Sequence, residues 1–252
     1  MALIFVGTGV WDETDISLRG LAELKRCDVL FAEEYTSETR EGTLERLGKL
    51  VGKKITVLAR EEVEDGTRIL AEAERKDVTL IVAGDPMIST THLSLKLDAL
   101  KRKIPVRIVH ASSILSGAIS ESGLHTYKFG RPVTLPFWSE DYKPTSTYDV
   151  IEENRARGLH TLLFLDIRDG KRMTAREAMA LLLKIEAEKK KKLFAKATKL
   201  VVLSRIGSGE EKISYGAIGR LEKAELGMTP FIIIVPGKLH FTEEEALLIN
   251  SV

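Results

Sequence analysis

The sequence has almost no cysteine, no excess of charge and no long apolar segment, and each absence excludes a class of protein. Its single cysteine, Cys27, cannot form an internal disulfide and fits a reducing compartment. With 38 basic and 37 acidic side chains the formal net charge is only +1, so the chain lacks the positive excess that nonspecific nucleic-acid binding uses. No apolar run approaches the roughly 18 residues of a membrane-spanning helix. We therefore expect a cytoplasmic protein without a membrane role.

We also expect no targeting segment at the amino terminus, because Met1-Ala-Leu-Ile-Phe-Val6 runs straight into glycine and acidic residues. We expect these residues to form the first strand. A chain of 252 residues with 44% hydrophobic content can bury an extensive core, and its length lies between the usual sizes for one and two domains. We expect two compact domains.

Short apolar runs alternate with segments of helical spacing through about residue 110. This alternation predicts an α/β domain with a mostly parallel sheet, covered by helices on both faces. The expected strands are Leu3 to Val6, Asp28 to Ala32, Ile55 to Leu58, Val78 to Ala83 and Val106 to Val109. In the helix expected from Ile16 to Cys27 the shared face is Leu18, Leu21, Ala22 and Leu24, and in the one from Leu93 to Arg102 it is Leu93, Leu97 and Leu100.

A segment rich in serine and glycine from Ser112 to Gly130 predicts the domain boundary, giving domains 1–112 and 113–252. A second series of strands and helices follows it. Two segments fit a capping box, in which a hydroxyl and a carboxylate satisfy free amides at a helix start. The boxes are Ser146-Thr-Tyr-Asp149 and Thr174-Ala-Arg-Glu177, and the strands expected here are Thr161 to Asp166, Leu200 to Leu203 and Phe231 to Val235.

Ligands of parallel sheets collect beyond the carboxyl ends of the strands, so the loops after each strand are the candidate site. Gly7-Thr-Gly9 resembles the start of a dinucleotide fingerprint, but Asp12 replaces the third glycine, and a simple tight turn explains it equally well. Asp85 of Gly84-Asp85-Pro86 could accept hydrogen bonds from ribose hydroxyls or an amino group. The five histidines have no metal-ligand spacing and no nucleophile elbow is present, so we expect no metal, and the catalytic residues remain unknown.

At these loops the chain resembles the tetrapyrrole methylase superfamily, and within it the archaeal diphthine synthase family, over essentially its full length. Eight segments in order carry the resemblance. They are Phe5-Val-Gly-Thr-Gly9, Asp15-Ile16 with Gly20-Leu21, Ala32-Glu-Glu-Tyr-Thr-Ser37, Ala83-Gly-Asp-Pro86 with Thr90-Thr-His92, His110-Ala-Ser-Ser-Ile114, Gly123-Leu-His125 with Tyr127-Lys-Phe-Gly130, Gly158-Leu-His-Thr-Leu-Leu-Phe-Leu-Asp-Ile167, and Val235-Pro-Gly-Lys-Leu-His240.

The resemblance implies two α/β domains with S-adenosylmethionine, the methyl donor, bound in the cleft between them. It also implies a homodimer whose substrate is translation elongation factor 2. The enzyme would successively methylate the amino group of a 3-amino-3-carboxypropyl chain on a histidine of that factor. By matching position, the donor would contact Val10, Asp85, Ile88, Ser113, Ile114, Leu165, Ile206 and Phe231. For Leu165, Ile206 and Phe231, simple packing in the core is the alternative.

A sulfonium methyl is already activated, so its transfer needs alignment and desolvation more than acid–base residues. A quaternary ammonium product could be accommodated by acidic or aromatic groups, for which Glu33, Glu34 and Tyr35 are candidates. Two other functions stay open. The chain could methylate a tetrapyrrole or ribosomal RNA, or it could be a noncatalytic nucleotide- or RNA-binding module that uses the basic run from Lys189 to Lys192.

Overall fold

A computed structural model gives the structure, which describes residues 1–35, 37, 39–139, 142–168 and 170–252. The chain divides into two compact units, Met1–Ile114 and Leu115–Val252. The first unit thus ends at Ile114, where the sequence suggested Ser112. Each unit has an apolar core of its own.

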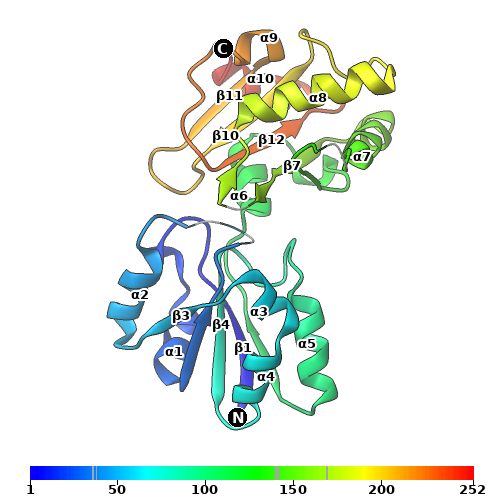
Figure 1. The fold of residues 1–252 in the computed structure, drawn as a ribbon. Coiled ribbons are helices and arrows are strands. Elements are labelled where there is room, and N and C mark those ends of the chain that lie inside the picture. The colour runs from blue at the N-terminus through cyan, green and yellow to red at the C-terminus, as the bar shows by residue number, and fades with distance from the viewer. Residues whose placement is uncertain (36, 38, 140–141, 169) are drawn as a thin grey trace. The chain divides into compact units, whose positions relative to one another are not determined.

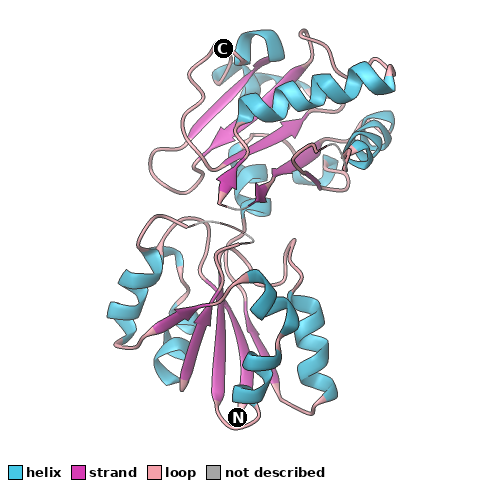
Figure 2. Cartoon of the chain, in the orientation of Figure 1, coloured by secondary structure: helices cyan, strands magenta, loops and turns pink. Residues whose placement is uncertain are grey.

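The first unit contains a five-stranded sheet with parallel pairings, in the order β3-β2-β4-β1-β5 (Figures 1 and 2). Parallel neighbours need crossover connections, which helices supply here. Because β1 lies between β4 and β5, the loops after β4 and β5 can meet only across its end. The strands are β1 (Ala2–Gly7), β2 (Val29–Ala32), β3 (Ile55–Val57), β4 (Asp77–Val82) and β5 (Val106–Val109). The helices are η1 (Glu13–Asp15), α1 (Leu18–Arg26), α2 (Thr43–Val51), α3 (Arg60–Asp65), α4 (Thr67–Ala73) and α5 (His92–Lys101).

Both faces of this sheet are buried, as the apolar strands predicted. Alternate residues of β1 point to opposite faces: Ile4 packs with residues of α1 and α2, whereas Phe5 packs with residues of α3, α4 and α5. Figure 1 shows the two groups of helices on either side of the strands. The expected strands and the α/β class of this unit are confirmed.

The faces of two helices differ from the expectation. In α1, Leu24 is fully buried but Leu18 is 87% exposed, because the helix approaches β1 at Gly20, where an added Cβ would lie 3.1 Å from Val6 Cγ1. In α5 the leucine face points to solvent, because the buried His92 imidazole binds the Pro86 carbonyl oxygen at 3.0 Å and turns the opposite face inward. The exposed residues are Leu93, Leu97 and Leu100, and the inward ones are His92, Leu95 and Ala99.

The second unit contains a mixed sheet in the order β11-β10-β12-β7-β6, in which only the β6–β7 pair is parallel. The strands expected at β7, β10 and β12 are confirmed, but β6 and the hairpin partner β11 were missed. The strands are β6 (Val133–Leu135), β7 (Thr161–Leu165), β8 (Ile167–Arg168), β9 (Lys171–Arg172), β10 (Lys199–Ser204), β11 (Lys212–Ala217) and β12 (Phe231–Val235). The helices are α6 (Ile114–Glu121), η2 (Thr126–Lys128), α7 (Thr145–Ala156), α8 (Ala175–Lys189), α9 (Ile218–Leu221) and α10 (Phe241–Ile249).

Of the two predicted capping boxes, one is confirmed. Thr174 and Glu177 cap each other's free amides at the start of α8. The box at Ser146 is wrong, because the cap of α7 is Pro144, two residues earlier, and Ser146 lies inside the helix. Asp149 instead binds the Lys189 ammonium at 2.8 Å.

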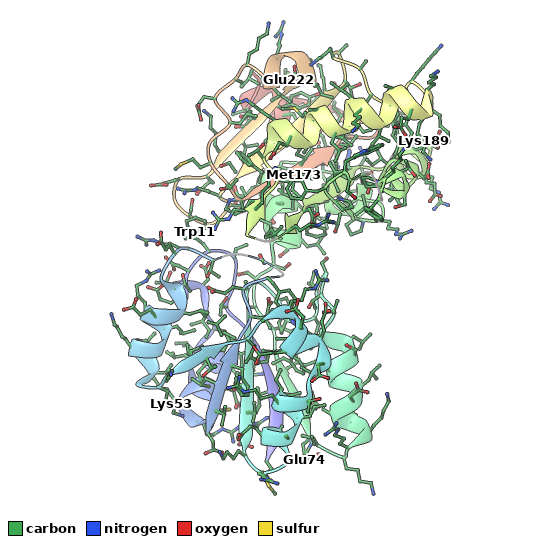
Figure 3. The ribbon with its side chains drawn as sticks, viewed as in Figure 1. Trp11, Lys53, Glu74, Met173, Lys189 and Glu222 are labelled. Atoms are coloured by element: carbon green, nitrogen blue, oxygen red, sulfur yellow. The ribbon has the colours of Figure 1, made fainter. Side chains whose placement is uncertain are left out.

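The basic run after α8 is a helix end with ion pairs. Lys189, labelled in Figure 3, is the last residue of α8, and Lys190 adopts the left-handed conformation that ends the helix. Lys191 binds Glu152 of α7 at 2.6 Å. Two of the four lysines are therefore already paired with carboxylates of α7.

Among the residues that the structure describes, no helix is long and apolar enough to cross a bilayer.

Candidate binding site at the sheet edge of the first unit

Three loops meet at the carboxyl edge of the parallel sheet. The loop after β1 is joined to the loop after β4 by backbone hydrogen bonds, in which the Gly84 amide donates to the Gly9 carbonyl at 2.8 Å. The predicted donor residues of this unit follow β1, β4 and β5, so the structure gathers them at one edge. They are Val10, Asp85, Ile88, Ser113 and Ile114.

Gly7, the last residue of β1, allows the loops to come this close. A Cβ at this position would lie 2.4 Å from the Gly84 carbonyl oxygen, 2.8 Å from Ala111 Cβ and 3.0 Å from Pro86 Cδ. Real side chains do not tolerate the first of these distances. The absence of a side chain at Gly7 therefore lets the loops after β4 and β5 meet across the end of β1.

Asp85 and His110 meet at this point. The Asp85 carboxylate is 6% exposed, and its Oδ2 atom lies 2.8 Å from His110 Nδ1. Backbone amides supply further donors, because Met87 N donates to Oδ1 at 3.0 Å and Ala111 N to Oδ2 at 3.4 Å. The carboxylate is thus held in place by hydrogen bonds to both of its oxygens. The His110 side chain, in contrast, is 70% exposed.

The other predicted residues of this edge differ in exposure. Ser113 is 5% exposed, whereas Ile88 is 38% exposed and presents an apolar surface beside the Asp85 loop. Ile114 is the first residue of α6. Gly84 adds open space, because nothing lies within 4 Å of a Cβ built there.

The candidates for binding the ammonium product lie after β2. Glu33 is only 2% exposed, and its carboxylate accepts the Tyr35 amide at 3.0 Å, so its side chain is directed inward. Its Oε1 atom lies 4.0 Å from Nε2 of the buried His92. Burial raises the pKa of Tyr35 to about 12. Of the three candidates only Glu34 is exposed; Thr36, which belongs to the same segment, lies outside the described residues.

The second unit brings the remaining three predicted residues to one edge of its own sheet. Leu165 ends β7 and Phe231 begins the antiparallel strand β12, so both lie at the same edge. Ile206 follows β10, which ends at this edge because Ser204 pairs with Phe231. Ile206 is 6% exposed, and the other two pack partly against the core. Their part in donor binding stays a prediction.

The three family-like segments of the second unit converge on one buried carboxylate, Glu243 of α10. Its oxygens accept from the Lys128 ammonium, from His160 Nε2 at 3.1 Å, and from the backbone amides of His125 and His240 at 2.8 and 2.7 Å. The Gly237 amide donates to His160 Nδ1 at 2.9 Å, so Nε2 carries the proton of a neutral imidazole. Burial opposes the charge of Glu243, but these donors prevail and lower its pKa to about 2.

The edge of the first unit fits part of the expected methyl donor. Asp85 Oδ1 has one lone pair left to accept from a hydroxyl or amino group, because Oδ2 already accepts twice. Ile88 offers an apolar surface, and Gly84 leaves room beside them. No group of three or more potential metal ligands occurs among the described residues. The edge thus suits an organic ligand with both polar and apolar parts.

The comparison of the sequence with known families gives the class of the protein: the chain belongs to the tetrapyrrole (corrin/porphyrin) methylase family, whose profile matches residues 2–222. Within this family, the chain is similar to diphthine synthases over nearly its full length. The diphthine synthase of Methanocaldococcus jannaschii is 43% identical over 250 residues, covering 97% of both chains. That of Methanococcus vannielii is 41% identical over 248 residues, again covering 97% of both.

A solved structure gives the same result. The crystal structure of a diphthine synthase superposes with a TM-score of 0.91 at 34% sequence identity, covering 100% of this chain and 96% of the other. The resemblance found in the eight segments is thereby confirmed. The sequence placed His110 in a candidate loop but missed its contact with Asp85, because only the strand order brings the two together.

Proposed function

We propose that this protein is a diphthine synthase. It uses S-adenosylmethionine to methylate, in successive transfers, the amino group of the 3-amino-3-carboxypropyl-modified histidine of translation elongation factor 2. The observation that carries the proposal is 43% identity to a diphthine synthase over 97% of both chains. A match of this extent leaves no large segment for a different substrate domain.

The donor supplies a methyl group that its sulfonium has already activated. The chain's own residues bind and orient it: Asp85 accepts from its polar groups, and Val10 and Ile88 contact its apolar parts. Ser113 and Ile114 complete the first unit's share, and Leu165, Ile206 and Phe231 provide the second unit's share. No metal is required for this chemistry, because aligning the methyl group with the acceptor is the main task.

The choice of acceptor follows from how far the reacting nitrogen extends from the backbone of elongation factor 2. The amine of the modified histidine can present a lone pair after losing one proton, whereas an unmodified imidazole holds its nitrogen several bonds short of that point. A misplacement of about 1 Å can cost roughly a hundredfold in rate. We therefore expect methylation only of the factor that already carries the 3-amino-3-carboxypropyl group.

The test incubates the protein with labelled donor and, in separate samples, with modified factor, unmodified factor and a precorrin-type tetrapyrrole. Mass spectrometry should find added methyl groups only on the modified factor. Labelling of either control, with none on the modified factor, would refute the assignment within the family.

Two alternatives are less well supported. A tetrapyrrole or RNA methyltransferase of the same family would share the first unit's edge, but three relatives that match over nearly the full length are diphthine synthases. A noncatalytic RNA-binding module would use the basic run after α8, where Lys189 and Lys191 are already paired with carboxylates.

The proposal includes a homodimer, which rests on the family resemblance, and a cytoplasmic location, which fits the single, buried cysteine. Light scattering at micromolar concentration should give the mass of two chains. The mass of one chain would contradict the dimer and leave the proposed activity untouched.

A further inference from the structure

The contact between Asp85 and His110 fixes which nitrogen of the imidazole carries the proton. An ionised carboxylate can only accept, so His110 Nδ1, 2.8 Å from Asp85 Oδ2, must be the donor. In the neutral ring the other nitrogen, Nε2, then has a free lone pair. The side chain that carries this lone pair is 70% exposed and follows β5, at the edge where Asp85, Ile88 and Ser113 lie.

Among the described residues, Asp85 is the one charged side chain that forms a hydrogen bond or ion pair with this imidazole. The loop after β1 offers Gly7, Thr8 and Gly9, and His110's own loop continues with Ala111, Ser112 and Ser113, all uncharged. Next to the Asp85 loop, His92 Nδ1 is hydrogen-bonded to the Pro86 carbonyl oxygen, and Glu33 Oε1 lies 4.0 Å from His92 Nε2. The carboxylate of Asp85 is thus the group that orients His110.

We propose that His110, oriented by Asp85, is the proton acceptor for the substrate amine between successive methyl transfers. The inference rests on the proposed function, and Asp85 acts in it as a positioning residue. An amine with an ordinary pKa of about 8 is roughly one-tenth neutral at pH 7, so a first acceptor can arrive from solution without its extra proton. After the first transfer the product is an ammonium that is already bound, and its proton must leave before the next attack.

The proton balance of each cycle is simple. The amine lone pair forms a bond to the methyl carbon while the carbon–sulfur bond breaks, and the bonding pair stays on sulfur, giving a neutral thioether. The secondary or tertiary ammonium so formed passes its N–H proton to His110 Nε2. The imidazolium then releases this proton to solvent, which its exposure permits. The quaternary product has no proton to lose, so the series ends there.

The test uses His110→Gln, which keeps a hydrogen-bonding group of similar reach but cannot take up a proton. Single-turnover reactions on modified elongation factor 2 are followed by mass spectrometry. We expect the first transfer to slow less than about threefold and the later ones at least tenfold, within the range that general bases contribute, so that monomethylated factor accumulates. Equal slowing of all transfers would overturn the proposal.

A matched control is His240→Gln, which removes another exposed imidazole and should keep the wild-type distribution of methylated products. Accumulation of monomethylated factor in this control as well would overturn the proposal.

Two measurements separate this inference from the donor site and from the proposed function. Calorimetry should give His110→Gln the wild-type donor affinity within about twofold, and a large loss with unchanged product distribution would assign His110 to the donor instead. Nitrogen-15 NMR of the free protein should show the Nδ1–H tautomer of His110, independently of any activity. Asp85→Asn can donate to Nδ1 and should switch the ring to the Nε2–H form. An Nε2–H tautomer in the wild type would overturn the proposal even if the factor is methylated.

Discussion

Replacing Glu243 by glutamine should destabilise the second unit in a way that depends on pH. The carboxylate accepts from four donors: the Lys128 ammonium, His160 Nε2 and the amides of His125 and His240. A glutamine oxygen has lone pairs for two donors, and its NH2 group would face the others. The substitution therefore leaves buried donors without an acceptor and Lys128 without its counter-charge.

The magnitude follows from the pKa. Lowering the pKa of Glu243 from its ordinary 4.5 to about 2 corresponds to about 3 kcal/mol of folded-state stability at neutral pH, at ~1.4 kcal/mol per pH unit. Two buried donors left without an acceptor, at about 1–3 kcal/mol each, give a loss of stability of the same order. Because the folded-state pKa is the lower one, this stability is present above about pH 4.5 and is lost as the pH falls toward 2.

His160 also makes the stability of the second unit decrease toward acid, in a higher pH range than Glu243. Burial lowers its pKa below the ordinary 6.5, so the unfolded chain binds this proton more readily than the folded one. Its contribution is therefore complete above pH 6.5 and decreases as the pH falls through the folded-state pKa. Both groups predict that acid weakens the second unit.

The assay uses the two tryptophans, one in each unit: Trp11, labelled in Figure 3, and Trp138, which packs against the core of the second unit. In a Trp11→Phe background, urea unfolding followed by fluorescence reports the second unit. Glu243→Gln should lose about 3 kcal/mol at pH 7 and progressively less toward pH 2. The matched control is Glu244→Gln, which removes the same charge from the next, exposed position of α10 and should change stability by less than about 0.5 kcal/mol. Equal losses in the two variants, or a loss that does not vary with pH, would refute the reasoning.

Three further predictions concern single sites. Asp85→Ala should weaken donor binding at least tenfold by calorimetry while the far-UV circular dichroism stays unchanged, and wild-type affinity would remove Asp85 from the site. Gly130→Ala should destabilise the second unit by about 2–4 kcal/mol in the same urea assay, because the new Cβ would lie 2.1 Å from Asn154 Oδ1; a wild-type midpoint would show that Asn154 can move at little cost. Burial raises the pKa of Tyr35 and Tyr148 to about 12, so alkaline titration at 295 nm should show two of the five tyrosines ionising near pH 12, and the ionisation of all five by pH 11 would contradict this.

The sequence predicted the first unit well because parallel strands buried on both faces are continuous apolar runs. It did less well with helix faces, since apolar spacing alone does not say which face packs. In α5 the leucines at 93, 97 and 100 form a regular stripe, yet the inward face is set by the contact between His92 and Pro86. Such a contact becomes visible only when the loop after β4 is placed.

The polar centres were beyond prediction for a different reason. The partners of Glu243 come from positions 125, 128, 160 and 240, and no local pattern joins them. Strand β11 was missed because its partly polar sequence, Lys212-Ile-Ser-Tyr-Gly-Ala217, lacks the apolar run of a buried strand. The pairing of Asp85 with His110 depends on strand order, which spacing along the chain does not contain.

Gly7 has a consequence for how this protein can diverge. The atom nearest to a Cβ there would be the backbone oxygen of Gly84, which every amino acid carries, so no replacement at position 84 could make room for it. Side chains in the loops after β4 and β5 can be replaced independently during evolution, but both backbone paths require that position 7 carries no side chain. Insertions and deletions in either loop should therefore be rare among active homologues. A homologue with alanine at this position would have to reroute both loops at once.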